Sequence, residues 1–303
     1  MPVTPTKIVF CSGIYEQSAI IQKIKFEHDN GFIVTDSTPF HPVSHIWADH
    51  PADRGTLTIH DQVYPVIDCQ VGAVELATGE LFVGQAIPVK RGEEGWAFVV
   101  VHVIQFEQNL PSLNKAADFT IKEGMEVELS IDTAYRYALN RGHSAGHLAS
   151  MALNKVLAER YWRKTPSNFD PLGNHDFNGY AQEISLVSED GCYDRYRLGK
   201  SLRKRGFNSA EMLNDLEEIN VIVNQQLKEW ISLNSPVVMR CEGEALTDSR
   251  YWQCDLGESQ MAVMPCGGTH VQSLAEFQQI TIRLQAMDDQ HIEMHTSVIP
   301  TSF

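Results

Sequence analysis

The spacing of the apolar residues changes near residue 130, and this change limits the folds that the chain can adopt. Before it, short apolar runs are separated by turn residues, as in GTLTIHDQVYPVIDC (55–69) and GWAFVVVHVIQF (95–106). Such runs are typical of strands. From Thr133 to about Arg163 the apolar residues recur at helical intervals instead. We therefore predict an α+β protein in which a small N-terminal β-barrel precedes a domain of helices and strands.

The C-terminal part mixes both kinds of element. Residues 164–180 are rich in Pro, Asn, Gly and Asp, which indicates a long loop. The segment EISLVSEDGCYDRYRL (183–198) predicts a hairpin that turns at Asp190 and Gly191. A helix is expected from Ser209 to about Leu233, where Ser-Ala-Glu-Met is close to a capping box. Further strands are expected at 236–243, 250–257, 276–288 and 290–299, and we place the two domains at 1–115 and 116–303.

The charge of the chain argues against one class of function. A formal net charge of −15 and a pI of about 5.2 do not suit a protein that binds nucleic acid nonspecifically through its total charge. A local basic cluster is nevertheless present in KSLRKR (200–205), with Lys200, Arg203, Lys204 and Arg205. Two interpretations stay open for it: a solvated face beside a helix, or a contact to phosphate.

The cysteines and the apolar runs indicate a cellular compartment. Six cysteines are scattered without a CxxC pair, so a disulfide framework is not expected. The first residues, MPVTPTKIVF, lack the pattern of a signal peptide, and the longest apolar runs are too short to cross a bilayer. We therefore expect a soluble, cytoplasmic protein without a membrane partner.

Two pairs of potential metal ligands stand out. His143 and His147 lie four residues apart in the expected helix, so their imidazoles share one face. Cys266 and His270 lie four apart on PCGGTH, where two glycines let the backbone curl. A thiolate with imidazoles favours zinc. Four protein ligands would make a closed structural site and three would leave room for water, and the sequence leaves both open.

Two other histidine pairs have the same spacing but a different context. His291 and His295 lie in an expected strand, where four residues span roughly 13 Å, too far to share one ion. His41 and His45 flank Pro42, which argues against a helix interior. We interpret both pairs as structural or surface residues.

Two segments resemble the signatures of a known family. SIDTAYRYALNRGHSAGHLASMAL (130–153) resembles a pattern of Asp, Arg and His-Ser-Ala-x-His-Leu, and RYWQCDLGESQMAVMPCGGTHV (250–271) resembles one that ends in Cys-Gly-Gly-Thr-His-Val. Both are typical of the alanyl-tRNA editing proteins called AlaX and of the editing domain of alanyl-tRNA synthetases. TPFHPVSHIWADHPADRG (38–55) resembles the family's N-terminal segment less strictly. The matching residues are Asp132, Arg136, His143, Ser144, Ala145, His147 and Leu148, and in the N-terminal segment Thr38, Phe40, Pro42, Pro51, Asp53 and Gly55.

The resemblance implies a function and a site. It implies a zinc-binding editing domain at 116–303 that deacylates mischarged tRNA(Ala), namely Ser-tRNA(Ala) or Gly-tRNA(Ala). The zinc would be held at the catalytic centre by His143, His147 and His270, with Cys266 as a fourth or displaceable ligand. Substrate binding is expected from Thr38, His50, Gly267, Gly268 and Thr269. Contacts to the RNA are expected from Arg136, Lys200, Arg203, Lys204 and Arg205. Glu276 is expected either to orient a ligand or to be a solvated residue at a strand edge.

The chain also departs from the family pattern, so two other functions stay open. VSHIWADH (43–50) replaces the family's glycine-rich run near the substrate, and residues 274–277 differ from the usual sequence after the second signature. The chain could therefore act on another aminoacyl ester or amide, which a basic surface near the zinc cleft would argue against. It could also be a binding module with a structural zinc, in which case metal removal would unfold it.

Overall fold

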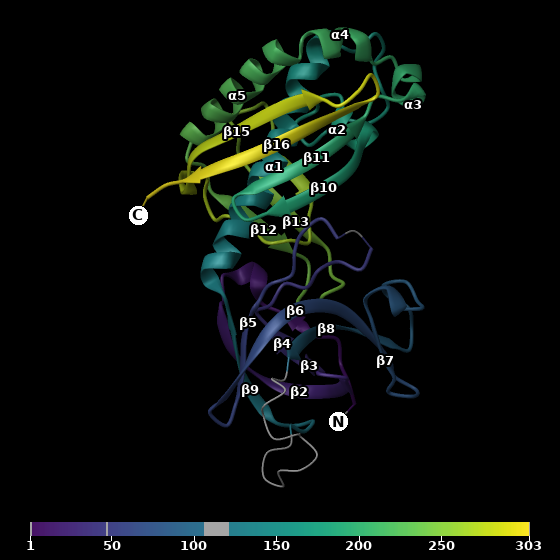
Figure 1. Cartoon of the computed structure of the whole chain (residues 1–303), viewed down its shortest axis with the longest axis vertical. Coiled ribbons are helices and arrows are strands. Elements are labelled where there is room, and N and C mark those ends of the chain that lie inside the picture. Colours follow the sequence, from purple (N-terminus) through teal and green to yellow (C-terminus); the bar gives the residue numbers. More distant parts are fainter. Residues whose placement is uncertain (1, 47, 106–120, 303) are drawn as a thin grey trace. The chain divides into compact units, whose positions relative to one another are not determined.

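The computed structural model describes residues 2–46, 48–105 and 121–302. The chain forms two compact units: unit 1 comprises Met1–Arg136 and Cys241–Ser249, and unit 2 comprises Tyr137–Arg240 and Arg250–Phe303. The predicted domain boundary after residue 115 lies outside the described residues. Together the units confirm a mixed α+β chain in which sheet predominates (Figure 1).

Unit 1 is built on a sheet that closes into a ring. Its seven strands follow the order β5-β9-β2-β3-β8-β6-β7, and β5 also pairs with β6. The strands are β2 (Glu16–Glu27), β3 (Asn30–Thr35), β5 (Gly55–Ile59), β6 (Gln62–Glu75), β7 (Leu81–Val83), β8 (Trp96–Gln105) and β9 (Glu126–Ile131). Shorter elements accompany them: β1 (Lys7–Ile8), which pairs with β4 (Ser37–Thr38), and the 3₁₀ turns η1 (Phe10–Ser12) and η2 (Gly84–Ala86).

The hairpin expected at residues 55–69 shows how the sequence specifies this sheet. β5 and β6 pair antiparallel from Gly55↔Val66 to Ile59↔Gln62. The turn residues His60 and Asp61 both have positive φ, 46° and 67°. Two successive left-handed residues give a turn whose twist matches that of the strands. Alternate residues such as Leu57 and Ile59 are buried in the core of unit 1.

A buried histidine lies inside this unit. His102 on β8 is 0% exposed; its Nε2 lies 2.8 Å from Thr38 Oγ1, and its Nδ1 lies 3.1 Å from the carbonyl oxygen of Ile33. Burial lowers the pKa of His102 from 6.5 to about 4. The imidazole is therefore neutral in the folded protein over a pH range in which the unfolded chain is protonated.

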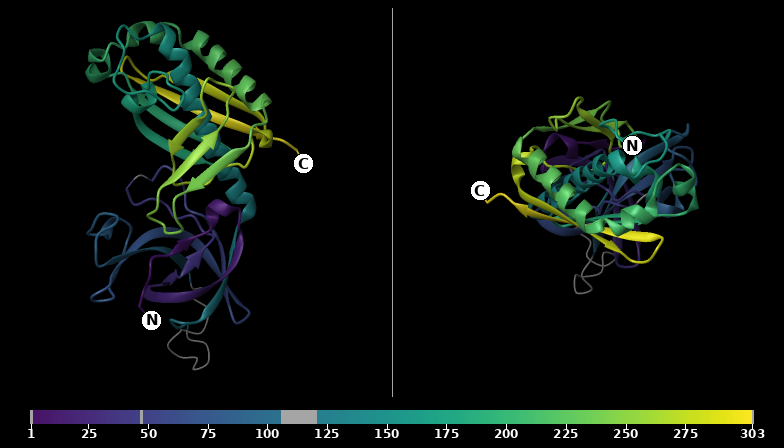
Figure 2. Two further views of the ribbon diagram at one scale, coloured as in Figure 1. Left: turned by 180° about the vertical axis from the view of Figure 1, so that it is seen from behind. Right: turned by 90° about the horizontal axis from the view of Figure 1, so that it is seen from above.

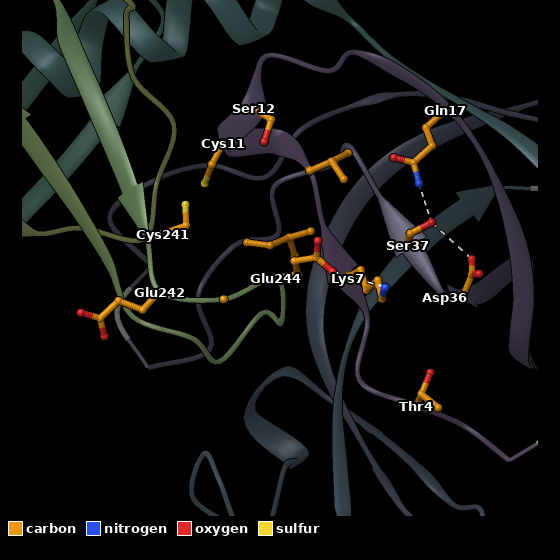
Figure 3. A pocket seen from close by; sticks show the side chains of 13 residues that line it. Thr4, Lys7, Cys11, Ser12, Gln17, Asp36, Ser37, Cys241, Glu242 and Glu244 are labelled. Carbon is orange, nitrogen blue, oxygen red and sulfur yellow. Dashed lines mark hydrogen bonds and ion pairs between the residues drawn. The ribbon is translucent and has the colours of Figure 1, made fainter.

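Unit 1 also contains a pocket of about 740 Å³ between its N-terminal segment and residues 241–244 (Figure 3). Polar side chains such as Gln17, Ser37 and Asp36 line one part of it, and Ser37 Oγ lies 3.4 Å from Asp36 Oδ1. Cys11 and Cys241 line another part.

Unit 2 contains two sheets and the long helix that carries the first histidine pair. One sheet has the order β10-β11-β16-β15, and the other has the order β12-β13-β14. The strands are β10 (Gln182–Ser188), β11 (Gly191–Arg197), β12 (Val237–Cys241), β13 (Arg250–Cys254), β14 (Ala262–Pro265), β15 (Phe277–Ala286) and β16 (His291–Pro300). The helices are α1 (Thr133–Arg160), α2 (Phe177–Ala181), α3 (Lys200–Lys204), α4 (Ser209–Asn214) and α5 (Leu216–Ser232), with a 3₁₀ turn η3 (Leu274–Glu276).

Helix α5 lies beside the edge strand β15, as Figure 2 also shows. Asn224 accepts a hydrogen bond from the backbone N–H of Ile282 at 2.7 Å and donates to its carbonyl at 3.0 Å. Asn220 forms the same pair of bonds with Leu284, at 2.7 and 3.3 Å. The helix therefore satisfies backbone groups that an edge strand would otherwise expose.

Two elements of the structure differ in detail from those predicted from the sequence. The helix expected from Ser209 to Leu233 breaks at Asp215 into α4 and α5, and the side chain of Asn208 forms no cap at its start. The Tyr161 hydroxyl donates to the Asp215 carboxylate at 3.0 Å, so this residue is fixed between the two helices. The loop expected at 164–180 ends in the short helix α2, which Asp176 caps through Gly179 N at 2.8 Å.

No helix in the described ranges is long and apolar enough to span a bilayer.

Helix α1 packs closely on the turn of the β10–β11 hairpin. Asp190 N donates to the carbonyl of Ala138 at 2.9 Å, and Arg141 pairs with the Asp190 carboxylate at 3.0 Å. A Cβ added at Gly142 would lie closer than 3.0 Å to the carbonyl oxygens of Ser188 and Gly191. Backbone atoms cannot move aside as a side chain can, so glycine is required at this crossing.

We expect Gly142→Ala to destabilise the fold by about 1–3 kcal/mol, because overpacking outweighs alanine's advantage of about 1 kcal/mol in a helix. Gly146→Ala is the matched control, since its Cβ would meet only the Cys192 side chain, at 3.0 Å from Sγ. Thermal unfolding followed by circular dichroism measures both. Equal midpoints for the two variants would contradict this account of the crossing.

We expect His102 to make the folded protein sensitive to acid. The pKa of His102 falls on folding, so between pH 6.5 and about 4 the unfolded chain binds a proton that the folded protein does not. The contribution of His102 to the free energy of unfolding is therefore fully present above pH 6.5 and is lost as the pH falls toward about 4. The decline amounts to about 3 kcal/mol for this residue. Urea unfolding at pH 7 and pH 4.5 should show a smaller loss for His102→Gln than for wild type. The exposed His28→Gln serves as the control, and an unchanged loss in His102→Gln would refute the assignment.

Candidate metal centre

The first two candidate ligands lie on α1. Asp132 starts this helix, because its Oδ1 accepts the backbone N–H of Tyr135 at 3.0 Å. This hydrogen bond is the largest cause that lowers the pKa of the Asp132 carboxyl. His143 and His147 follow one turn apart, and their ring centroids lie 4.6 Å from each other.

The other two candidate ligands lie on the turn after β14. Cys266 N donates to the carbonyl of Arg250 at 3.0 Å, which extends the pairing of β13 and β14 to the first ligand. A Cβ at Gly267 would lie 3.1 Å from the Arg250 guanidinium, so the backbone passes close to this side chain. The turn then brings His270 back toward α1, where its ring stacks on His143 at 4.2 Å between centroids.

Three imidazole nitrogens converge on one sulfur. Cys266 Sγ lies 3.2 Å from His270 Nε2, 3.3 Å from His147 Nε2 and 3.5 Å from His143 Nε2. One ligand atom from each of the four residues lies within 4.8 Å of the others. Such a cluster could hold a metal ion.

The distances fit a tetrahedral ion. With metal–sulfur and metal–nitrogen bonds of about 2.3 and 2.0–2.1 Å, tetrahedral geometry places sulfur and nitrogen about 3.5 Å apart. The three observed separations of 3.2–3.5 Å are close to this value. One thiolate and three imidazoles suit zinc among the common metals.

Hydrogen bonds orient two of the imidazoles so that Nε2 faces the cluster. His143 Nδ1 lies 3.1 Å from the Thr269 carbonyl, so Nδ1 carries the proton and donates it to this oxygen. His270 Nδ1 lies 3.0 Å from Ser144 Oγ, which also accepts the backbone N–H of Val271 at 3.2 Å. In the tautomer that leaves Nε2 unprotonated, His270 donates to Ser144. These partners are of the kind that fix a metal-binding histidine.

The surroundings of His147 favour a neutral imidazole, and Trp252 packs against its ring. Burial, with a smaller contribution from neighbouring His143, lowers the pKa of His147 well below 6.5, so its nitrogen lone pair is available at neutral pH. The fully buried Trp252 lies edge-on to the His147 ring at 5.7 Å. His143 and His270 are buried, whereas His147 and Cys266 are half-buried. Solvent therefore reaches the cluster on the side of His147 and Cys266.

The residues that were expected to bind the substrate lie in two different parts of the structure. Gly267, Gly268 and Thr269 form the turn between the ligands Cys266 and His270. Thr38 and His50 belong to unit 1 and are buried there: Thr38 hydrogen-bonds His102, and His50 Nδ1 lies 2.8 Å from the Pro51 carbonyl. Their expected role in substrate binding stays a prediction.

Arg136, for which a contact to RNA was expected, is buried in unit 1. Arg136 is 1% exposed, and its guanidinium forms a bidentate ion pair with the Asp53 carboxylate, including Nε to Oδ1 at 2.7 Å. It also donates to the Pro39 carbonyl at 2.9 Å. Because burying one charge without its partner is costly, Arg136 and Asp53 act together inside unit 1. The other expected RNA contacts, Lys200, Arg203, Lys204 and Arg205, are exposed at α3 and its end.

Glu276 neither orients a metal ligand nor lies at a solvated strand edge. Its carboxylate accepts the backbone N–H groups of Gln272 at 2.7 Å and Ser273 at 3.3 Å, and Ser273 Oγ accepts the N–H of Ala275 at 3.1 Å. These bonds form a capping box at η3.

Sequence reasoning overlooked the roles of Ser144 and of the Thr269 backbone. Ser144 was visible only as a match to the family motif. The signal that could have found it is its position on α1 next to His143, together with a small hydroxyl side chain. The Thr269 carbonyl could not be inferred, because any residue at that position has one.

We expect Ser144→Ala to weaken zinc binding by about 10–100-fold, because residues that orient metal ligands have effects of this size. Ser150→Ala is the control, since Ser150 lies on the same helix and its hydroxyl donates to the His147 carbonyl at 3.0 Å instead. Competition with a fluorescent zinc chelator measures both affinities. Wild-type affinity in Ser144→Ala would show that this hydrogen bond has no part in metal binding.

Comparison with known proteins gives the site a context. No family model matches the chain. The chain is 27% identical over 266 residues to the alanyl-tRNA editing protein AlaX-M of Pyrococcus horikoshii, a match that covers 87% of this chain and 86% of that protein. It is 27% identical over 259 residues to the alanine–tRNA ligase of Saccharophagus degradans, and 26% identical over 148 residues to that of Methanosarcina mazei. These two matches cover 81% and 49% of this chain but only 22% and 12% of the ligases. The resemblance to the alanyl-tRNA editing proteins, first indicated by the two motifs, is thus confirmed over most of the chain.

Proposed function

We propose that this chain is a zinc-dependent hydrolase that removes the wrong amino acid from mischarged tRNA(Ala). The convergence of three histidine nitrogens on Cys266 Sγ carries the proposal, since it occurs in a chain similar to AlaX-M along most of both lengths. By the family resemblance, the substrates are Ser-tRNA(Ala) or Gly-tRNA(Ala). The scissile bond is the ester between the amino acid and the terminal ribose.

The residues of the chain would have separate tasks in this reaction. His143, His147 and His270 would hold the zinc, and Cys266 would be a fourth or displaceable ligand. When bound, the ion would supply Lewis acidity for the hydrolysis of the ester. The Thr269 carbonyl keeps the proton of His143 on Nδ1, and Ser144 Oγ can accept the Nδ1 proton of His270 in the tautomer that leaves its Nε2 free for the ion. The substrate would approach on the half-exposed side of the cluster, where Cys266 and the exposed Gly267 lie.

We expect the zinc-loaded protein to release serine or glycine from Ser-tRNA(Ala) or Gly-tRNA(Ala) and to leave Ala-tRNA(Ala) intact. His143→Ala should lower the rate at least 100-fold, because it removes one of three zinc-holding imidazoles. Release of labelled amino acid measures the rates, and circular dichroism checks the fold of the variant. If the zinc-loaded wild type hydrolyses none of the three substrates, the proposed activity is refuted.

A structural zinc is the second candidate, and one observation favours it. Four donors already satisfy a tetrahedral ion, so no ligand position is left for water unless Cys266 moves. Chelation distinguishes the two roles. If the ion is catalytic, its removal should abolish activity and change the midpoint of thermal unfolding by no more than a few degrees. A structural ion should unfold unit 2 when it is removed.

A further inference from the structure

The structure extends the basic cluster of residues 200–205 with two cations from another part of the chain. Trp162 and Phe207 form an antiparallel bridge, and Arg163 N donates to the carbonyl of Gly206 at 2.8 Å. This pairing sets Arg163 and Lys164 beside the segment that ends α3. The resulting basic surface contains Arg163, Lys164, Lys200, Arg203, Lys204 and Arg205, all of them exposed.

The fold arranges these cations toward solvent. Lys200, Arg203 and Lys204 share one face of α3 by their spacing, whereas Leu202 is buried on the other face. The Arg205 guanidinium lies over the Tyr180 ring, 4.7 Å from its centroid. The tyrosine hydroxyl accepts the backbone N–H of Asn168 at 2.8 Å, so the platform under Arg205 is itself fixed.

The cations of the basic surface are not paired with acidic side chains of the described residues. The carboxylates of Glu211, Asp215 and Glu218 on α4 and α5 lie instead at 3.5, 2.9 and 3.2 Å from Arg160. None of the six cations forms an ion pair in the part of the chain that the structure describes. Six of the 24 Lys and Arg residues thus gather at one place in a chain of net charge −15. Such a concentration suits a polyanion.

The position of the basic surface relative to the candidate metal centre favours a long polyanion such as RNA. His147 lies 13 residues before Arg160, the last residue of α1, so about 20 Å of helix separates His147 from the end of α1, which Arg163 of the basic surface follows three residues later. An ester bond at the end of an RNA strand could therefore lie at the cluster while phosphates farther along the RNA reach the cations. A free aminoacyl ester is too small to reach both places.

We propose that the basic surface binds the phosphate backbone of the substrate tRNA. This inference rests on the proposed function for the identity of the RNA, and it selects an aminoacyl-tRNA over a small ester as the substrate. Lysine and arginine contacts to phosphate make RNA binding depend on salt, with a slope of about 0.7–0.9 per contact. The loss of each contact should therefore reduce the salt slope by this amount.

The test compares two triple variants of the full chain that remove equal charge. One is Lys164→Ala/Lys200→Ala/Lys204→Ala, and the control is Lys90→Ala/Lys122→Ala/Lys228→Ala, in which all three lysines are also exposed. Uncharged tRNA(Ala) is titrated from 50 to 300 mM KCl. We expect the first variant to bind about 10–100-fold more weakly at low salt, with a salt slope smaller by about two to three. The control should behave as wild type.

Hydrolysis by the same variants separates this inference from the proposed function. The first variant should lose kcat/KM on Ser-tRNA(Ala) and keep it on the serine ester of adenosine, which carries no RNA body. An unchanged salt slope, or binding to phosphatidylserine vesicles that is tighter than to tRNA, would overturn the role of the basic surface. Binding to tRNA that depends on the surface, without hydrolysis of any aminoacyl-tRNA, would contradict the proposed function alone.

Discussion

The candidate metal centre depends on the hydrogen bonds that join α1 to the turn at 266–270. Ser144 accepts from Val271 N and contacts His270, and Thr269 accepts from His143. Each half of the cluster thereby orients an imidazole of the other half. Neither pair of ligands could bind an ion tightly alone, because a metal site needs several donors fixed at the proper distance and angle.

The rest of unit 2 fixes these two halves in place. Gly142 lets α1 approach the β10–β11 hairpin, and the ion pair of Arg141 with Asp190 strengthens the same contact. On the other half, the pairing of β13 with β14 continues to Cys266. The buried Trp252 of β13 then supports the rings of His147 and His270. The cluster therefore rests on regular elements, which suits a site that requires accurate geometry.

Much of this could be predicted from the sequence, and the reasons are physical. The spacing of His143 and His147 specifies one helix face, and the glycines of PCGGTH allow a tight turn, so the sequence predicted the four residues that the structure brings together. The strand at His291 and His295 was also expected, and in β16 these side chains pair with Asp288 and Glu293 instead of forming a metal cluster in the described chain.

Other features depend on contacts between distant residues and could not be read from local patterns. The break at Asp215 depends on Tyr161, which lies 54 residues away. The burial of Arg136 depends on Asp53, and the extension of the basic surface depends on the bridge between Trp162 and Phe207. At Glu276 a local pattern was overlooked: the sequence left open a residue that orients a metal ligand or one at a solvated strand edge, and the carboxylate forms a capping box with Ser273.

The central claim is that His143, His147, Cys266 and His270 bind one zinc ion, and X-ray absorption at the zinc edge tests it most directly. We expect a shell of three nitrogens at about 2.0–2.1 Å and one sulfur at about 2.3 Å in the zinc-loaded protein. The sulfur contribution should disappear in Cys266→Ser while the nitrogens remain. A shell of oxygens alone, or a sulfur signal unchanged in Cys266→Ser, would contradict the account.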